Sequence, residues 1–593
     1  MATTTLRPGS GHAAAIVKGG AWLIEPTSAE SIFTPEKLSD EHKLIARTAE
    51  QFVQQEAVPA LDKLEQHDWS VARALLKRCG DLGLLGVDVP EEYGGLALDK
   101  VTSMVVSANM SKSASFAATF GSQANLTILP LMLFGTPAQK EKYLPKLVSG
   151  DMAGAYCLSE TGSGSDALGA KTKATRQPDG SFVLNGEKMW ITNGGFADLY
   201  IVFAKVDGEH FTAFIVERAF GVTSGKEEHK MGLHGSSTTA VILQDVKVPA
   251  DNLLGEIGKG HKVAFNVLNF GRFKLGGMCI GGARDAIGES AKYAAQRKQF
   301  GQPIASFGAI KHKLGEMIAR TYAGESFIYR TAGIIDERIG GAKDGATAAA
   351  ALEEYSVEAS IAKVAGSETL DFVLDENIQI HGGNGYVRDY PAERHYRDAR
   401  VNRIFEGTNE INRLLIPGTL ARRAVKGEIG LIAAAKALQD ELLGPPSMST
   451  PDDSPLADER RAVDAFKKTA LMVFGMALQT YGTKLADQQE VLTYAADILI
   501  DVYSAESALL RALSAQGSSR ASLHVDAARV FINDAAGRIE IAAKQALAAM
   551  ASGDALRTML AGLRRLLKVM PIDAVTLRRR LADEAVARGG YIF

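Results

Sequence analysis

Cysteine is scarce in this sequence, and long apolar runs are missing. Only three cysteines occur in 593 residues, at Cys79, Cys157 and Cys279. Because they lie far apart and are odd in number, they exclude a disulfide framework and a Cys-x-x-Cys metal site. A reducing compartment is the natural interpretation. No uncharged apolar run reaches about 18 residues, so the sequence predicts no membrane-spanning helix.

An excess of basic charge is also lacking. The chain carries 66 Lys and Arg residues against 69 Asp and Glu residues, a formal net charge of −3. Dedicated nucleic-acid binders usually contain a strongly basic domain, so we expect no nucleic-acid partner. The content of 46% hydrophobic and 23% charged residues is ordinary for a soluble globular protein. At roughly 150 residues per domain, the length predicts about four domain-sized units.

The N-terminal stretch has a charge bias of its own. Arg7 and Lys18 precede the first acidic residue, Glu25, and mitochondrial leaders share this bias. Two basic residues make a poor leader, so we favour a loose N-terminal arm over residues 1–34. A bacterial cytoplasmic location is favoured accordingly, with the mitochondrial matrix as the alternative.

The hydrophobic pattern changes twice along the chain. Residues 35–152 have helical periodicity, residues 153–252 contain short β-rich runs between turn residues, and residues 253–428 return to helical periodicity. Strands without intervening helices predict an antiparallel sheet or barrel. A Pro- and Ser-rich connector is expected over 429–458, followed by an Ala-rich helical domain over 459–593. The predicted fold class is α+β, mostly α.

Within these regions, separate elements are expected. Strand-like runs cover residues 155–158, 182–184, 199–204, 211–216 and 240–243. The second helical region should contain separate helices at 259–267 and 283–297, then long ones at 307–339 and 348–377.

Two familiar kinds of site are not supported. The glycines of residues 162–167 imitate a dinucleotide fingerprint, but more sheet follows where a Rossmann unit needs a helix. The small residues of this loop can still let backbone N–H groups approach a ligand. The histidines do not cluster with carboxylates at metal-ligand spacing, so no metal site is predicted.

Glu406 lies between an aromatic residue and a glycine, in the sequence Phe405-Glu406-Gly407. A carboxylate beside Phe405 would be partly desolvated, which raises its pKa toward that of a general base. The alternative is a surface glutamate at a helix start, with Thr408 or Asn409 as the N-cap. The residues by themselves leave both interpretations open.

Five segments in the same order resemble the acyl-CoA dehydrogenase family. They are residues 156–166 (YCLSETGSGSD), 188–194 (KMWITNG), 296–301 (QRKQFG), 379–385 (QIHGGNG) and 405–411 (FEGTNEI). The resemblance covers roughly residues 35–425, and it implies the fold of that family: an N-terminal helical domain, a central antiparallel β-domain and a helical bundle. The additional C-terminal helical domain is similar to the very-long-chain branch and its bacterial relatives.

The resemblance implies an FAD-dependent α,β-dehydrogenation of a fatty acyl-CoA, with long chains favoured, to the trans-2-enoyl-CoA. Glu406 would remove the α-proton, and the β-hydrogen would leave as hydride to the flavin. The thioester carbonyl would accept hydrogen bonds from the Glu406 N–H and an FAD ribityl hydroxyl, which stabilise the developing enolate. Electron-transferring flavoprotein would receive the electrons.

Residue roles follow from the matching positions. FAD contacts are implied for Tyr156, Leu158, Ser159, Ser165, Trp190, Thr192, Arg297, Phe300, Gln379, Gly383, Thr408 and Glu410. Acyl-CoA contacts are implied for Ser165, Asn269, Arg272 and Gly407. Arg297 would reach the pyrophosphate of a neighbouring subunit's FAD, which requires a homo-oligomer, at least a dimer.

Two positions depart from other members. Some members carry the base at the position of Gly271, which cannot serve here, so Glu406 is the matching base. Gly308 stands where medium-chain members carry a glutamine near FAD. An acyl-CoA oxidase, which passes electrons to oxygen, and a non-catalytic flavoprotein of the same fold remain alternatives.

Membrane contact is the last question that the sequence raises. Residues 430–443 form an apolar face that includes Leu431, Leu438 and Leu442, with Lys436 as the only basic residue. Interfacial helices usually carry several basic residues on the polar face. We therefore favour packing of this face on the C-terminal helices over membrane binding.

Overall fold

The computed structural model describes residues 17–342, 344–444, 452 and 454–593. Its first domain is helical, and two of its helices begin at capping boxes, Ser39 with His42 and Thr136 with Gln139, which satisfy otherwise free N–H groups. A π-helical turn, η5 (Ala124–Ile128), joins α5 to α6. The helices are α1 (Asp40–Phe52), α2 (Leu61–Glu65), α3 (Trp69–Asp81), α4 (Lys100–Asn109), α5 (Ala114–Gln123), α6 (Leu129–Phe134) and α7 (Pro137–Val148).

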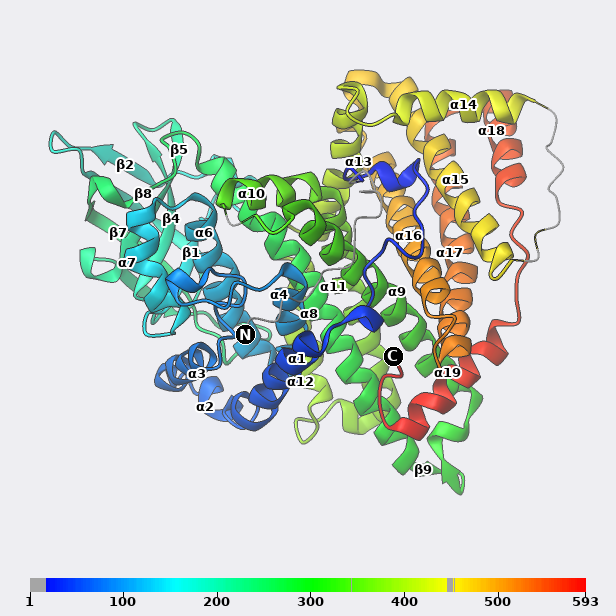
Figure 1. Ribbon diagram of the computed structural model, residues 1–593, viewed down its shortest axis with the longest axis horizontal. Coiled ribbons are helices and arrows are strands. Elements are labelled where there is room, and N and C mark those ends of the chain that lie inside the picture. The colour runs from blue at the N-terminus through cyan, green and yellow to red at the C-terminus, as the bar shows by residue number, and fades with distance from the viewer. Residues whose placement is uncertain (1–16, 343, 445–451, 453) are drawn as a thin grey trace, which may run out of the picture.

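The second domain is an eight-stranded sheet at one end of the molecule (Figure 1). The strands are β1 (Gly154–Cys157), β2 (Lys173–Arg176), β3 (Phe182–Thr192), β4 (Leu199–Val206), β5 (His210–Glu217), β6 (Thr223–Glu227), β7 (Thr238–Val248) and β8 (Leu253–Leu254). The order is β6-β7-β3-β2-β4-β5-β8, with β1 beside β4. Most pairs are antiparallel, as predicted, but β1 and β2 both run parallel to β4, a pairing that alternation cannot reveal.

The third domain forms the centre of the molecule in Figure 1. Its helices are α8 (Gly260–Gln296), α9 (Gly308–Ile339), α10 (Gly345–Glu354), α11 (Ser356–His381), α12 (Ala392–Ala399) and α13 (Asn409–Val425). A small hairpin, β9 (Lys298–Gln299) with β10 (Gln302–Pro303), follows α8. The predicted α+β, mostly α class is confirmed.

The prediction of two helices at 259–267 and 283–297 is wrong, because α8 runs unbroken through the glycines between them. Those glycines allow close packing. A Cβ at Gly276 would lie 2.5 Å from the carbonyl oxygen of Ala362, and one at Gly366 would lie 2.8 Å from that of Gly276. The helices α8 and α11 therefore touch by their backbones at this crossing. The expected single helix over 348–377 is instead two, α10 and α11, which meet at the non-helical residue Tyr355.

The C-terminal helices share a continuous core with the third domain. They are α14 (Leu431–Leu443), α15 (Ala457–Tyr481), α16 (Gln489–Ser514), α17 (Ala521–Met550), α18 (Gly553–Leu566) and α19 (Ala574–Arg588). In Figure 1 they lie beside α9, at the end opposite the sheet. Arg511 of α16 is completely buried and pairs with Glu325 of α9 at 2.8 Å and with Glu36 at 2.7 Å. A buried charge of this kind needs such partners.

The prediction of a loose arm over 1–34 is wrong for the residues that the structure describes. Trp22 is 2% exposed, and its Nε1 donates to Oε1 of Glu358 at 3.0 Å. The N–H of Gly20 donates to the same oxygen at 2.7 Å. This part of the chain is thus fixed to α11.

The expected connector over 429–458 contains a helix, α14, and most of its Pro- and Ser-rich part lies outside the described residues. Leu431 and Leu438 of α14 are buried, whereas Ile432 and Leu443 stay exposed. Lys468 of α15 pairs with Glu441 at 2.7 Å. Part of the predicted apolar face, at Leu431 and Leu438, therefore packs as favoured from the sequence, whereas Ile432 and Leu443 of that face do not.

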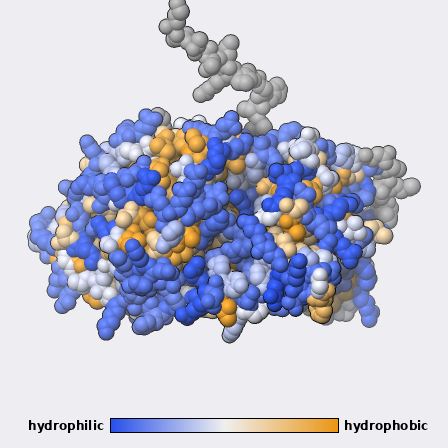
Figure 2. Space-filling model, turned by 90° about the horizontal axis from the view of Figure 1, so that it is seen from below, coloured by the Kyte–Doolittle hydropathy of each residue, from blue (hydrophilic) through white to orange (hydrophobic). Residues whose placement is uncertain are grey.

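Figure 2 shows one face of the molecule, where hydrophilic residues dominate and hydrophobic ones form separate patches. Among the described helices, none combines the length and apolar character that crossing a membrane requires.

Candidate active site

Glu406 lies in a tight loop between a short helix, η11 (Arg400–Arg403), and α13. Glu406 and Gly407 both have left-handed backbone conformations, with φ of 59° and 76°. A non-glycine residue in this region costs about 1–3 kcal/mol, and such strain is concentrated at functional sites. Thr408 then caps α13, because its Oγ1 accepts a hydrogen bond from the N–H of Ile411 at 3.3 Å.

Three side chains from three helices hold the carbonyl groups of this loop. Nε of Arg272 donates to the oxygen of Glu406 at 3.0 Å. Nζ of Lys363 and Nδ2 of Asn412 each donate to the oxygen of Gly407 at 2.8 Å. These bonds fix the strained turn and so determine where the Glu406 side chain lies.

The Glu406 carboxyl group itself is left unpaired. The residue as a whole is half-buried, but its Oε2 is shielded from solvent and has no hydrogen-bond partner among the described residues. Burial raises the pKa of Glu406 to about 7, while the positive charges of Arg272 and Lys363 act in the opposite direction. Of the two interpretations that the residues left open, the structure shows a desolvated carboxyl group and not a surface glutamate.

Gly271 explains the space around this carboxyl group. A Cβ at this position would lie 2.9 Å from Oε2 of Glu406, closer than van der Waals contact allows. The glycine therefore leaves room for the carboxyl group and cannot act as a base itself.

Glu406 faces a cavity of about 100 Å³ between the first and third domains. Thr192, at the end of β3, lines the same cavity, so a β-domain residue and Glu406 share one space. Most of the remaining wall is apolar, from Met110, Ala117, Ala118, Phe120, Gly121, Leu126, Leu275, Met278 and Phe405, with polar contributions from Ser107, Ser122, Asn125 and Lys274. Such a lining suits an apolar ligand with few polar groups.

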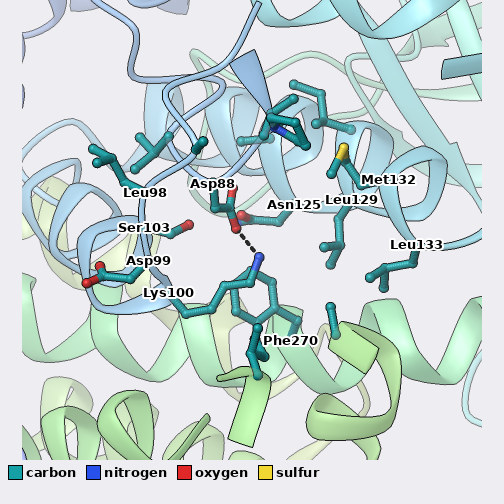
Figure 3. Close-up of a pocket in the computed structure, with 18 of the residues that line it drawn as sticks. Asp88, Leu98, Asp99, Lys100, Ser103, Asn125, Leu129, Met132, Leu133 and Phe270 are labelled. Carbon is teal, nitrogen blue, oxygen red and sulfur yellow. Dashed lines mark hydrogen bonds and ion pairs between the residues drawn. The ribbon is translucent and has the colours of Figure 1, made fainter. Parts of the chain in front are cut away.

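Two further cavities share walls with this one. A cavity of about 60 Å³ between α5, α8, α11 and α12 shares Ala118, Met278 and Phe405 with the Glu406 cavity. A larger cavity of about 570 Å³, shown in Figure 3, shares Phe120, Asn125 and Lys274.

The larger cavity combines an apolar wall with buried charges. Leu129, Met132 and Leu133 line it on one side (Figure 3). Opposite them, Nζ of Lys100 pairs with Oδ2 of Asp88 at 2.5 Å. Lys274 donates to the carbonyl oxygen and the hydroxyl group of Ser103, and burial lowers its pKa to about 7.

The two predicted flavin segments of the β-domain lie side by side. The N–H of Met189 donates to the carbonyl oxygen of Ser159 at 2.9 Å, which joins the segment of Tyr156 and Leu158 to that of Trp190 and Thr192. The Tyr156 hydroxyl group is buried without a partner among the described residues, and burial, with the Glu406 charge second, raises its pKa well above the usual value.

Trp190 and the loop of Ser165 present an open surface. Trp190 is 59% exposed and left-handed, with φ of 57°. Ser165 is exposed, and a Cβ added at Gly162 or Gly164 would meet nothing within 4 Å. The exposed Trp190 ring and the open loop of Ser165 form a surface that a flat polar cofactor can cover.

Four predicted cofactor residues lie elsewhere. Arg297 and Phe300 are exposed at the β9 hairpin, and Gln379 and Gly383 are exposed at the end of α11. The two segments are held together, because the hydroxyl group of Tyr293 donates to the carbonyl oxygen of His381 at 3.1 Å. In Figure 1 the hairpin lies far from the β-domain. Within one chain the structure does not unite these residues with Trp190.

The remaining predicted contacts lie near the loop. Asn269 is buried, and its Oδ1 accepts from Nη1 of Arg272 at 3.1 Å. Glu410, in the first turn of α13, is exposed. Lys363 and Asn412 also hold the loop, although neither was predicted from the sequence. Lys363 acts through a carbonyl 44 positions away, and Asn412 acts through the carbonyl of Gly407, five positions before it; neither contact is marked by a local pattern of residue types. Among the described residues, no group of three or more metal-binding side chains could hold an ion.

Family comparisons agree with this arrangement. The models described as the N-terminal, middle and C-terminal domains of acyl-CoA dehydrogenase match residues 39–151, 155–246 and 258–420. Another model described as an acyl-CoA dehydrogenase C-terminal domain matches residues 465–565.

Individual relatives match different shares of this chain. A probable acyl-CoA dehydrogenase of Bacillus subtilis is 48% identical over 583 residues, 96% of this chain and 98% of the relative. The human mitochondrial very long-chain specific enzyme is 40% identical over 60% of this chain and 53% of its own length.

Among solved structures too, some match nearly the whole chain and others only about two thirds of it. An acyl-CoA dehydrogenase from Bacillus anthracis, complexed with FAD, is 48% identical and covers 97% of this chain and all of the other, with a TM-score of 0.95. Butyryl-CoA dehydrogenase from Megasphaera elsdenii is 38% identical and covers 65% of this chain and 99% of its own, with a TM-score of 0.60. Matched in order through all its domains, and by a relative of the same length, this chain belongs to the acyl-CoA dehydrogenase family.

Proposed function

We propose that this chain is an FAD-dependent dehydrogenase that converts fatty acyl-CoA thioesters to trans-2-enoyl-CoA, with Glu406 as the base. One observation carries the proposal: an unpaired carboxyl oxygen, Oε2 of Glu406, faces a mostly apolar cavity. A carboxyl group without a partner is costly to bury. Its retention here is explained if it takes a proton from a bound substrate.

The chain's own residues would prepare this proton transfer. Glu406 has a pKa of about 7, so near neutral pH a large fraction is ionised and is a stronger base than an exposed carboxylate. The α-proton of a thioester is a weak acid, so the developing enolate oxygen needs donors. The left-handed loop at Glu406 and Gly407, fixed by Arg272 and Lys363, would supply the Glu406 N–H as one of them.

FAD fits the residues that remain open. The segment from Tyr156 to Ser165 would meet the pyrimidine edge, with Ser159 supplying a hydroxyl group, while the exposed Trp190 and cavity-lining Thr192 would flank the ring system. The Bacillus anthracis relative was solved with FAD. Bound FAD supplies the acceptor for the β-hydrogen, which leaves as hydride.

A second chain would complete the cofactor site. Arg297, Phe300, Gln379 and Gly383 are exposed and gathered at one place, yet they lie away from Trp190 in the same chain. A homodimer in which each chain covers the partner's FAD with these residues would use both groups. A guanidinium group such as that of Arg297 is well suited to a pyrophosphate.

Long-chain substrates are favoured by the second cavity. The Glu406 cavity shares Ala118 and Met278 with a further cavity whose exposed wall is mostly apolar, although Lys112, Asp285, His395 and Asp398 also line it. The larger cavity beyond Lys274 is less suitable for an alkyl chain, because polar atoms, including those of Lys274 and the Lys100–Asp88 pair, make up a much larger share of its exposed wall. Burial against apolar side chains stabilises a bound alkyl tail, whereas contact with charged groups does not.

Electron-transferring flavoprotein is the proposed acceptor, and the bacterial cytoplasm the proposed location. Both rest on membership of the family and on the bacterial relative of equal length. Reoxidation rates of the reduced flavin in air and with electron-transferring flavoprotein separate a dehydrogenase from an oxidase.

The direct test mixes purified protein with hexadecanoyl-CoA without oxygen. We expect the yellow flavin band to bleach and the trans-2-enoyl product to form in equal amount. A protein that binds FAD but neither bleaches nor forms an enoyl product with any acyl-CoA from butanoyl to eicosanoyl would contradict the proposal.

A further inference from the structure

The C-terminal domain is connected to the Glu406 loop by a continuous line of polar side chains. We infer that Asp497, on α16, is a positioning residue that holds this loop in its active geometry through Arg413, Glu368, Asn409 and Lys363. The inference rests on the proposed function of Glu406 as the base. It gives the additional domain a role in the reaction beyond burying apolar surface.

The series of polar side chains begins at Lys363, which contacts the Glu406 loop. Lys363, which donates to the carbonyl oxygen of Gly407, also donates to Oδ1 of Asn409 at 2.5 Å. Asn409 is 2% exposed and begins α13. A lysine ammonium group rotates freely on its stem, so the amide oxygen of Asn409 fixes the direction in which Nζ reaches the loop.

Asn409 is fixed in turn by α11. Its Nδ2 donates to Oε1 of Glu368 at 2.9 Å and to Oγ of Ser367 at 3.1 Å. These two acceptors orient the amide so that its oxygen faces Lys363. A displaced Glu368 would leave a buried amide donor without a charged partner, which is costly.

Arg413 holds Glu368 with both arms of its guanidinium group. Nη1 donates to Oε1 at 2.7 Å and Nη2 donates to Oε2 at 2.8 Å. Nε of the same group donates to Oδ1 of Asp497 at 2.7 Å. All three nitrogen atoms of the planar guanidinium group therefore donate a hydrogen bond, and the bond to Asp497 fixes the plane in which the group meets Glu368.

Asp497 is the one member of this line that the C-terminal domain contributes. Its side chain is 40% exposed, so its removal creates no cavity, and alanine is favourable in a helix. One turn further along α16, Asp501 pairs with Arg538 of α17 at 2.7 Å and is only 14% exposed. This second pair lies within the C-terminal domain and makes no contact with the loop, which makes it a matched control.

The test compares Asp497→Ala and Asp501→Ala as FAD-loaded full-length proteins. For Asp497→Ala we expect kcat with hexadecanoyl-CoA to fall about tenfold, as displacement of a reacting group does, with KM, FAD content and Tm close to wild type. Asp497→Asn should recover most of the loss, because its amide oxygen still accepts from Nε of Arg413. Arg413→Lys, which lacks the fork, should lose as much as Asp497→Ala.

A second measurement does not depend on turnover. Hydrogen–deuterium exchange of peptides covering residues 404–412 should be faster in Asp497→Ala than in wild type or Asp501→Ala. Equal exchange and equal kcat in the two alanine variants would overturn the inference. If wild type fails to dehydrogenate acyl-CoA, the proposed function is wrong, and the exchange comparison still decides whether Asp497 orders the loop.

Discussion

Arg272 binds Glu406 through the backbone and leaves its carboxyl group free. Nε donates to the carbonyl oxygen of Glu406 at 3.0 Å, while Oε2 keeps no partner among the described residues. An ion pair with the carboxylate would have made it a weak base. The hydrogen bond from Arg272 to the carbonyl oxygen instead fixes the strained loop. The guanidinium charge only moderates the effect of burial on the pKa of Glu406.

The first prediction concerns the base itself. Glu406→Gln should retain fold and FAD but lose several orders of magnitude in kcat, because Gly271 leaves no second base. Glu428→Gln, which changes an exposed acid outside the proposed site, serves as the control for charge alone. Steady-state rates decide the matter: activity of Glu406→Gln within about tenfold of wild type, a barrier change of about 1.4 kcal/mol, would refute the assignment.

The second prediction concerns pH. The pKa of Glu406 is raised to about 7 by burial, and only its ionised form can accept the α-proton. The value of kcat/KM for the free enzyme should therefore rise with pH, with its midpoint near 7, and level off above it. Since the charge of Lys363 lowers this pKa, Lys363→Met should move the midpoint to higher pH. A profile that is flat between pH values of about 5 and 9 would contradict a desolvated base.

The third prediction uses the space beside the carboxyl group. Gly271→Ala would place a Cβ 2.9 Å from Oε2 of Glu406, so the base must shift. We expect kcat to fall about tenfold or more, a change of about 1.4 kcal/mol in the barrier. The control is Gly288→Ala on the same helix, where the nearest atom to an added Cβ is 3.7 Å away. Similar kcat values for the two variants would show that Gly271 does not determine the position of the base.

Contiguous motifs made much of this site predictable. Glu406 and Thr192 belong to short segments whose residue types resemble a known family, so their roles could be stated before their positions were known. The fold class followed from the change between helical and alternating patterns. These features are patterns of neighbouring residues, which can be recognised without knowing the tertiary contacts.

Contacts between distant segments were not predictable in this way. Lys363 donates to a carbonyl oxygen 44 positions away. Every residue has a backbone carbonyl group, so the residue types around Gly407 do not reveal this contact. The helical patterns at 259–267 and 283–297 do not reveal that one helix joins them, because the glycines between them are unfavourable within a helix. Only the close crossing of Gly276 with Gly366 of α11 shows why they are tolerated there.

The fourth prediction concerns the shared cofactor site. Arg297→Ala should weaken FAD retention, because two phosphate charges lose a guanidinium partner. Lys298→Ala, which removes an adjacent exposed charge, should retain FAD as wild type does. Flavin content after gel filtration and the elution volume are measured together. A monomer that keeps FAD fully would exclude a site made by two chains.

The fifth prediction concerns the path of the acyl chain. Ala118 lines both the Glu406 cavity and its extension of about 60 Å³. Ala118→Phe should therefore close the extension and lower kcat/KM for hexadecanoyl-CoA by about tenfold or more, while butanoyl-CoA is affected little, since pocket contacts of this size are worth about 1–3 kcal/mol.

Lys274→Met is the matched control, because Lys274 lines the wall toward the larger cavity instead. Its ratio of kcat/KM for hexadecanoyl- and butanoyl-CoA should stay close to that of wild type. If Lys274→Met changes this ratio and Ala118→Phe does not, the alkyl chain runs past Lys274 into the larger cavity, and the charged groups there contact the substrate.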